Sequence, residues 1–302
     1  MNEFSVAAVA AGILGIFGFI FPVYTLTIKP DAPEKPKYEI VTDLDDSFTA
    51  QSVLVFDVKT GERKIDVGSK TVLPIASLTK IMTGLVALGF LNPDEQIVLS
   101  KEAAATDGDV GHLRQGELFL VKDLFRAMMM SSSNDAATAL AQVAGERMGS
   151  GTFDENITHF VEAMNRKAGE LGMRDTRFEN PTGLDDISEK PSNYSSANDL
   201  ATLIQYTQQV PLLWELSRDA QRDVYSDRGR EYFLFNLNEI LGLIPHVVGS
   251  KTGSTPLAGD SLIFIFENPL GHKQATILLG AEHGKRFEEA GRILQTVLSV
   301  LP

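Results

Sequence analysis

The sequence contains no cysteine, and this absence limits the chemistry open to the 302-residue chain. Without cysteine there is no thiol nucleophile, no thiolate metal ligand and no disulfide, and either redox compartment is compatible with the chain. The five histidines are scattered without an HExxH or similar ligand spacing, so we predict no zinc site and no other cofactor. The G-x-S-x-G elbow of Ser-His-Asp hydrolases and the GxxxxGK[ST] phosphate loop are absent as well.

Positive charge is in deficit. Lys and Arg number 27 against 40 Asp and Glu, which gives a net charge of −13 and a pI near 4.9. An acidic surface repels phosphates, so we expect no nucleic-acid partner. The hydrophobic fraction of 43% is that of a globular protein, and the length suits one or two domains with a large core.

Charged side chains are missing altogether from residues 4–28, FSVAAVAAGILGIFGFIFPVYTLTI. As a helix this run rises about 37 Å, which exceeds a hydrocarbon core of about 30 Å. We predict an N-terminal membrane anchor over residues 1–28; a cleaved signal peptide is the alternative, although no small-x-small cleavage site follows the run. The positive-inside rule would place Lys29, Lys35 and Lys37 in the cytoplasm, but long trailing domains are translocated largely regardless of charge.

The rest of the chain is predicted to be a spacer followed by one domain. Residues 29–46 are proline-rich with alternating charges, which is typical of an extended linker. Over residues 47–302, strand patterns occur near both ends and mainly helical patterns lie between them, with a long helix expected from Pro74 and a final helix over about 287–300. We predict a mixed α/β (α+β) fold, in which one antiparallel sheet is assembled from both termini, is flanked by helices and carries an inserted all-helical subdomain.

Ser77 and Lys80 are the only serine and lysine in the sequence with an S-x-x-K spacing. On a helix, residues three apart share a face, so the two side chains can meet. A serine hydroxyl needs a base to become a nucleophile, and a lysine can be that base if burial and a second cation hold it neutral. Leu78, Ile81 and Met82 surround Lys80, whereas a merely solvated lysine would lie on a polar face.

A second candidate element is Ser132-Ser133-Asn134, between two apolar helical runs. Serine or asparagine before an Ala-rich run is also typical of a helix N-cap. In the functional interpretation, Ser132 relays a proton and Asn134 hydrogen-bonds a substrate amide. The other S-x-N match, at Ser196, lacks a preceding apolar helix, and we interpret it as structural.

The third element is Lys251-Thr252-Gly253, at the end of an apolar run whose strand edge could pair with an extended peptide. Lys251 would supply the second cation, and the hydroxyls of Thr252 and Thr255 could hold a substrate carboxylate. The other Lys-Thr-Gly, at residues 59–61, lies between two charged hairpin arms and is interpreted as an ordinary turn.

In this order, the three elements resemble those of the penicillin-binding serine acyl-transferases, and the likeness covers roughly residues 50–290. The chain resembles the low-molecular-weight penicillin-binding proteins of the D-alanyl-D-alanine carboxypeptidase family. The segments that carry the resemblance are PIASLTKIMT, GELFLVKDLFRAMMMSSSNDAATALA, FENPTGLDD, NYSSANDLATL, FNLNEILG and VGSKTGSTPLAG. The implied fold is β-lactamase/transpeptidase-like, with the active site between an α/β sandwich and a helical part.

The resemblance implies a role for each matched residue. Ser77 would be the acylated nucleophile and Lys80 its general base, and the backbone N–H groups of Ser77 and Ser254 would form the oxyanion hole. Catalytic candidates are Ser77, Lys80, Ser132, Asn134 and Lys251, and substrate-binding candidates are Thr252, Gly253, Ser254 and Thr255. Arg286 is a candidate partner for the substrate carboxylate.

The implied substrate is a peptidoglycan stem peptide that loses its terminal D-Ala, and β-lactam antibiotics would be covalent inhibitors. A cell-wall substrate places the domain on the outer side of the cell membrane, held by a single-pass anchor. Ser133 departs from the glycine usual at that position in these carboxypeptidases, and serine is small enough to substitute for it. Many relatives carry a further β-rich domain and a C-terminal amphipathic anchor, and we expect the N-terminal helix to take over the anchoring here.

Three alternatives remain at this point. A DD-endopeptidase shares the whole constellation with a carboxypeptidase. A β-lactamase shares the acylation machinery, although no E-x-x-L-N segment of the class A kind occurs. A catalytically silent wall-binding module is the third, and the intact residues Ser77, Lys80 and Lys251 argue against it.

Overall fold

The computed structural model describes residues 45, 48–108, 112–185, 192–268 and 270–299. The chain divides into two compact units, residues 1–37 and 38–302, and every described residue belongs to the second. The predicted anchor lies outside the described residues, as does all of the predicted linker except Asp45. None of the helices in the described ranges combines the length and the apolar character needed to cross a bilayer.

A five-stranded antiparallel sheet forms the centre of the second unit, in the strand order β2-β1-β11-β10-β9. Ser52 on the first strand is paired with Leu279 on the last, so the two ends of the domain meet in the middle of the sheet. This confirms the sheet predicted from both termini. The strands are β1 (Ser52–Asp57), β2 (Arg63–Val67), β9 (Val247–Thr255), β10 (Gly259–Glu267) and β11 (Lys273–Ala281).

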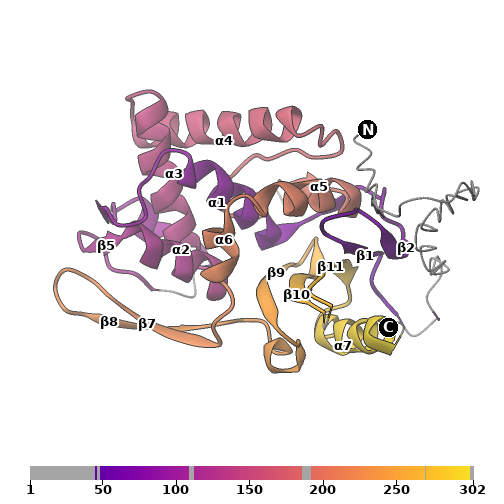
Figure 1. The fold of residues 1–302 in the computed structure, drawn as a ribbon. Helices are drawn as coiled ribbons and strands as arrows, with labels where there is room; N and C mark the ends of the chain where they lie inside the picture. The colour runs from indigo at the N-terminus through magenta and orange to yellow at the C-terminus, as the bar shows by residue number, and fades with distance from the viewer. Residues whose placement is uncertain (1–44, 46–47, 109–111, 186–191, 269, 300–302) are drawn as a thin grey trace, which may run out of the picture. The chain divides into compact units, whose positions relative to one another are not determined.

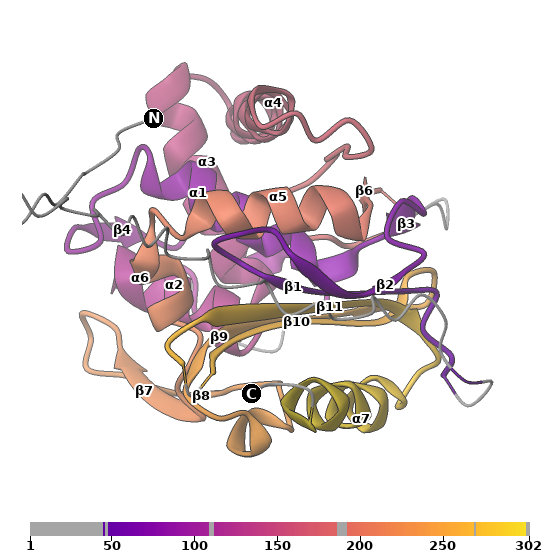
Figure 2. The ribbon, with the colours of Figure 1, turned by 45° about the vertical axis from the view of Figure 1, so that its right-hand side comes forward.

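Helices cover both faces of this sheet (Figure 2). Successive side chains of a strand point to opposite faces, so β1 contributes Leu54 to one apolar cluster and Val55 to the other. The cluster of Val55 is completed by the C-terminal helix α7 (Arg286–Ser299), and the cluster of Leu54 extends into the other helices. Because both faces are buried, the strand sequences SLIFIFE and ATILLGA are nearly continuous apolar runs.

The predicted helical subdomain is present between β2 and β9, but it is not all-helical, because short paired strands occur in it as well. Figure 1 shows several of its helices beyond one end of the sheet, whereas the helix of Ala197–Thr207 lies over one face of the sheet (Figure 2). The α-helices are α1 (Lys80–Leu88), α2 (Val121–Met130), α3 (Asn134–Met148), α4 (Phe153–Glu170), α5 (Ala197–Thr207) and α6 (Pro211–Glu215), with short 3₁₀ turns η1 (Ala76–Thr79), η2 (Ala103–Ala105) and η3 (Leu241–Leu243). Two-residue strands β3 (Leu73–Pro74) and β6 (Tyr194–Ser195) pair with each other, as do β4 (Gln96–Val98) and β5 (Leu118–Leu120).

Two local features differ from the sequence prediction. The long helix expected from Pro74 is wrong at its start: Pro74 ends a strand, Ala76 has φ +44°, and the α-helix begins only at Lys80. An L-residue in the left-handed region cannot continue a right-handed helix, so the segment forms a 3₁₀ turn first. The hairpin of β7 (Gln221–Tyr225) and β8 (Glu231–Phe235) was not predicted.

Candidate active site

Ser77 lies in η1, on the turn that leads into α1, and its side chain is half-buried. Lys80 is the first residue of α1, three positions later, and its side chain is fully buried. The Lys80 Nζ atom lies 2.8 Å from Ser77 Oγ, as the helical spacing predicted. Nucleophile and candidate base are therefore within proton-transfer distance.

Two further oxygens fix the amine of Lys80. Its Nζ atom lies 2.7 Å from Asn134 Oδ1, which is at the first position of α3, and 2.6 Å from the backbone carbonyl of Thr182. The amide nitrogen of Asn134 donates to the carbonyls of Asp107 and Gly108, at 2.9 and 3.1 Å. In this structure the Asn134 side chain thus joins Lys80 to a neighbouring loop.

Ser132 occupies the turn between α2 and α3 and has φ +58°, which is uncommon for a residue other than glycine. Ser133 is the N-cap of α3 and accepts a hydrogen bond from the Ala136 N–H at 3.1 Å. The capping interpretation and the functional interpretation of this segment are therefore compatible, because Ser133 caps the helix while its two neighbours face other candidate residues.

Lys251, on β9, donates from Nζ to Ser132 Oγ and to the carbonyl of Thr252, both at 2.9 Å. The lysine is fully enclosed, and burial lowers its pKa well below the usual value, with the neighbouring basic groups of Lys80 and Arg286 adding to the effect. The structure therefore brings the five catalytic candidates together: Ser77, Lys80, Ser132, Asn134 and Lys251. Arg286 adds a third basic side chain beside the two lysines.

β9 is an edge strand of the sheet, and its glycine allows it to approach the nucleophile turn. A Cβ at Gly253 would lie 3.0 Å from the Ile75 carbonyl oxygen and 3.2 Å from the Leu78 nitrogen, and nine in ten real Cβ contacts are longer than this. Thr252 is buried beside this glycine. The hydroxyl of Thr255 accepts from the Ala258 N–H at 3.1 Å, so it also shapes the turn to β10.

Arg286, at the start of α7, approaches the same strand. Its Nη1 donates to the carbonyl of Gly253 at 3.1 Å and lies 3.5 Å from Asp260 Oδ1. The exposed Ser254 donates from Oγ to the same Asp260 oxygen at 2.7 Å. The sequence contained no signal that Asp260 belongs to this group.

Sequence reasoning also assigned no role to the loop Asn180-Pro181-Thr182-Gly183, which lies against the nucleophile turn. The Asn180 Oδ1 accepts from the backbone N–H groups of Thr182 and Gly183, at 3.1 and 2.7 Å, and so folds the loop. This turn points the Thr182 carbonyl at Lys80. A Cβ at Gly183 would lie 2.0 Å from the Ala76 carbonyl oxygen, so only glycine fits there. The Asn-Pro-x-Gly turn pattern was the available signal.

The two duplicate motifs are structural. Lys59 and Thr60 form the turn between β1 and β2, where their backbone N–H groups donate to Asp57 Oδ1 at 3.0 and 2.8 Å. Ser196 is the N-cap of α5 and accepts from the Asp199 N–H at 3.2 Å.

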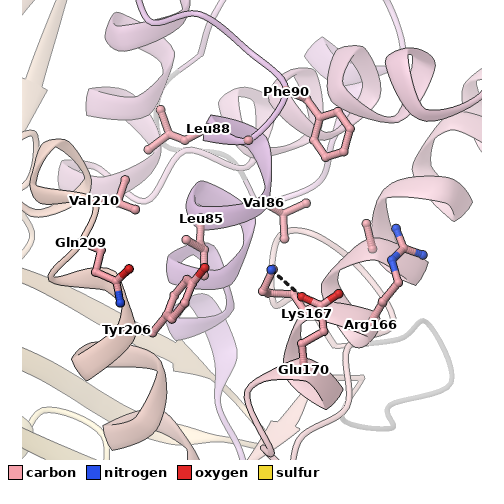
Figure 3. Close-up of a pocket in the computed structure, with 12 residues that line it drawn as sticks. Leu85, Val86, Leu88, Phe90, Arg166, Lys167, Glu170, Tyr206, Gln209 and Val210 are labelled. Carbon is pink, nitrogen blue, oxygen red and sulfur yellow. Dashed lines mark hydrogen bonds and ion pairs between the residues drawn. The ribbon is translucent and has the colours of Figure 1, made fainter.

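A separate cavity of about 490 Å³ lies between the end of α1, α4 and α5 (Figure 3). Leu85 and Val86 on α1 face it, and the ion pair of Lys167 and Glu170 lies at one side. None of the predicted site residues lines this cavity. Among the described residues no group of three or more His, Cys, Asp or Glu is placed to hold a metal ion.

Comparisons with known proteins bear on the family and the fold of the chain. The profile of the D-alanyl-D-alanine carboxypeptidase family, peptidase S11, matches residues 39–281. The chain is 30% identical to the D-alanyl-D-alanine carboxypeptidase DacF of Bacillus subtilis over 238 residues, which are 77% of this chain and 57% of DacF. It is also 30% identical to a D-alanyl-D-alanine endopeptidase of Pseudomonas aeruginosa over 250 residues, 82% of this chain and 73% of the relative.

Solved structures show the same fold. Penicillin-binding protein D2 of Listeria monocytogenes, in its ampicillin-bound form, is 29% identical with a TM-score of 0.69, over 84% of this chain and 99% of that one. A point mutant of the Streptomyces K15 DD-transpeptidase has a TM-score of 0.76 at 24% identity, over 85% of this chain and all of that one. Although the chain spans little more than half the length of DacF, the family profile matches most of it. The chain belongs to the D-alanyl-D-alanine carboxypeptidase family, peptidase S11.

Proposed function

We propose that the chain is a serine-type D-alanyl-D-alanine carboxypeptidase that acts on peptidoglycan stem peptides through an acyl-enzyme at Ser77. The observation that carries this proposal is the 2.8 Å distance between Lys80 Nζ and Ser77 Oγ, beside the buried Lys251 and the partly buried Arg286. Membership of the S11 family supports the same reaction.

The neighbours of Lys80 suit a general base. A neutral amine has two hydrogens and one lone pair. The two acceptors, Asn134 Oδ1 and the Thr182 carbonyl, can each take one hydrogen. With both hydrogens so placed, the lone pair can face the hydroxyl of Ser77, 2.8 Å away.

In acylation, the Ser77 oxygen forms a bond to the carbonyl carbon of the penultimate D-Ala, and Lys80 takes the hydroxyl proton. The oxyanion of the tetrahedral intermediate is stabilised by the backbone N–H groups of Ser77 and Ser254. The C–N bond then breaks, and the proton that Lys80 received passes to the leaving amine of D-Ala through Ser132, whose hydroxyl contacts Lys251. In the second half-reaction Lys80, neutral again, takes a proton from a water molecule as the water oxygen bonds to the acyl carbon. The bond from that carbon to Ser77 Oγ then breaks, and Ser77 takes the proton back from Lys80.

The edge strand β9 supports substrate binding. Its outer edge can pair with the main chain of an extended stem peptide. Thr252, Thr255 and Arg286 would hold the terminal carboxylate, because Arg286 contacts the strand at Gly253. A β-lactam presents a similar carbonyl and carboxylate, so we propose that it acylates the same serine.

The test is acylation of the full-length protein in detergent by fluorescent penicillin, with peptide mapping of the labelled residue. Label on Ser77, and none on a Ser77→Ala variant, supports the proposal. Incubation with a stem pentapeptide should then yield a product lighter by one alanine residue. A wild-type protein that stays unlabelled beside a labelled control penicillin-binding protein would refute the proposal.

DD-endopeptidase activity is the second candidate, because relatives with that name match over most of the chain. In that reaction the leaving amine belongs to a second stem peptide instead of free D-Ala. Cross-linked dimers, incubated in parallel with the pentapeptide, separate the two activities by the masses of the products.

We further propose that residues 1–28 anchor the chain in the cell membrane, that residues 29–46 are a spacer, and that the catalytic domain, residues 47–302, lies on the extracytoplasmic side. The uncharged run at 4–28 and a cell-wall substrate support this topology. Alkaline extraction of membranes should leave the full-length protein in the pellet, and protease added to spheroplasts should degrade the domain. Release of the intact protein into the soluble fraction would contradict the anchor.

A further inference from the structure

Asp260 is a buried carboxylate beside the candidate carboxylate-binding residue. It lies at the start of β10, paired across the sheet with Ser254. Its Oδ1 accepts from Ser254 Oγ at 2.7 Å and lies 3.1 Å from His283 Nδ1, and its Oδ2 accepts from the Gly284 N–H at 3.0 Å. Arg286 Nη1 lies 3.5 Å from Oδ1. One carboxylate therefore joins the end of β9 to the segment that leads into α7.

Asp260 carries its negative charge at neutral pH. Burial alone would raise the pKa of its carboxyl, but the hydrogen bonds from Ser254 and Gly284 and the charge of Arg286 outweigh burial and lower the pKa below the usual value. The charge of Asp260 acts on Arg286 in return. Burial lowers the pKa of the Arg286 guanidinium, and the charges of Asp260 and, to a smaller extent, Glu239 oppose this effect.

Arg286 retains capacity for a second anion. A guanidinium has five N–H donors. The described polar contacts of Arg286 are one hydrogen bond, to the Gly253 carbonyl, and the ion pair with Asp260, and its guanidinium lies 4.6 Å from the centre of the Phe287 ring. Its buried Nε has no acceptor among the described residues. A substrate carboxylate that binds Arg286 would therefore share one guanidinium with Asp260, and the two negative charges would repel each other.

We propose that Asp260 is a specificity-determining residue: its carboxylate offsets the positive charge of Arg286 and weakens the preference for a leaving residue with a free carboxylate. The enzyme then also accepts peptides whose terminal carboxyl group is blocked or amidated. This inference rests on the proposed D-alanyl-D-alanine peptidase function and specifies the substrate class of that same site.

The effect is large enough to measure. Two like charges on opposite sides of one guanidinium, at the effective dielectric of a protein site, reduce binding of the second by on the order of tenfold to a hundredfold. Removing the charge of Asp260 should recover this factor for a carboxylate substrate and leave an amide substrate nearly unchanged.

Asp260→Asn is the appropriate variant because the surrounding network can accommodate an amide. The amide oxygen can accept from the Gly284 N–H, and the amide nitrogen can donate to the Ser254 hydroxyl and to the unprotonated Nδ1 of His283. Glu162→Gln is the matched control. It removes one negative charge from an exposed position on α4, with no described ion pair.

The experiment compares kcat/KM of full-length protein in detergent for two peptides that end in D-Ala-D-Ala, one with a free carboxylate and one with a terminal amide. We expect the carboxylate-to-amide ratio to rise at least about tenfold in Asp260→Asn and to stay within about twofold of wild type in Glu162→Gln. The conservative variant Asp260→Glu, which keeps the charge, should retain the wild-type ratio.

An unchanged or lower ratio in a folded Asp260→Asn protein overturns the inference. Equal loss with both peptides would show that Asp260 only positions its neighbours, and that also overturns it. Thermal melting establishes folding, and Asp260→Ser replaces the Asn variant if the latter does not fold. If the wild-type protein releases neither D-alanine nor D-alaninamide and is not acylated by penicillin, the proposed function is wrong and the inference is wrong with it. If the wild-type protein is active, the carboxylate-to-amide ratio of kcat/KM alone tests the inference.

Discussion

Replacing Gly183 by alanine should disable the nucleophile turn through a backbone contact alone. Gly183 has φ +86°, and it lies against the backbone that precedes the nucleophile: an added Cβ would be 2.0 Å from the Ala76 carbonyl oxygen and 2.9 Å from the Ser77 nitrogen. Real Cβ atoms are essentially never closer than 3.0 Å to such atoms. The turn must therefore move by about 1 Å or more, and with it the Ser77 N–H that is proposed to bind the oxyanion.

The expected magnitude has two parts. An alanine in the left-handed region costs roughly 1–2 kcal/mol of folding stability, wherever it occurs. A displacement of about 1 Å in a catalytic group can cost about a hundredfold in rate, and loss of one oxyanion donor costs about 10²–10³. We expect acylation of Ser77 in Gly183→Ala to fall by about a hundredfold or more.

Gly172→Ala is the matched control, because Gly172 has φ +75° and an added Cβ would meet no atom within 4 Å. It should lose the same roughly 1–2 kcal/mol from backbone conformation and keep its acylation rate within about twofold. The assay is the rate of labelling by fluorescent penicillin at a temperature where both variants are folded, with melting curves measured alongside. A Gly183→Ala rate within about threefold of the Gly172→Ala rate would show that the close approach to Ala76 does not position the nucleophile.

Two further predictions concern the predicted serine elements and a buried acid. Ser132→Ala should slow acylation by about 10²–10⁴, because it removes the hydroxyl that contacts Lys251. The control, Ser196→Ala in the duplicate motif, should lose only about 1 kcal/mol of folding stability, because it removes a helix cap. Equal rates of penicillin labelling in the two variants would contradict the catalytic role of Ser132. Glu117 has its pKa lowered to about 2: burial raises it, but hydrogen bonds from the Tyr232 hydroxyl and from Arg230 outweigh burial. Because the pKa of Glu117 is lower in the folded state, this stabilisation is present above the unfolded-state value of 4.5 and is lost as pH falls toward 2. The free energy of unfolding in urea should therefore decrease less between neutral and acid pH in Glu117→Gln than in wild type.

The parts of the site that depend on local spacing were predictable from the sequence. Ser77 and Lys80 meet because positions three apart on a helical segment share a face, and this holds although the helix begins later than expected. The sheet was predictable because its strands are short apolar runs bounded by turn residues. The hairpin of β7 and β8 was missed because its first strand, QRDVY, is mostly polar and exposed, and only the alternation in EYFLF indicates a strand.

The parts that depend on tertiary contacts could not be predicted. One neighbour of Lys80 is a backbone carbonyl, that of Thr182, and a backbone group leaves no signature in the residue type that carries it. Asp260 is one acid among 40 acidic residues, and nothing in its local pattern distinguishes it from an exposed one. Its proximity to Arg286 exists only because the turn between β9 and β10 lies against the start of α7.

The charge state of Lys251 is set in the same non-local way, and it yields a last prediction. Burial lowers the pKa of Lys251 most, and the neighbouring basic groups of Lys80 and Arg286 lower it further. In the proposed mechanism Lys251 acts as a cation, so activity should fall as pH rises through its pKa. Arg286→Met removes one of the lowering charges, so the pKa of Lys251 should rise and the alkaline limb of the acylation profile should move to higher pH.

The control for this shift is Arg166→Met, which removes an exposed charge on α4, distant in sequence from all three basic residues of the site. Acylation by penicillin is measured from neutral to alkaline pH for both variants, and the limb is compared with that of wild type. Because Arg286 also binds the carboxylate in the proposal, its loss lowers the rate at every pH, whereas only the electrostatic coupling moves the limb. A lower rate with an unmoved limb, or a limb moved to lower pH, would mean that Lys251 does not act as the cation, since its pKa must respond to a neighbouring charge that is removed.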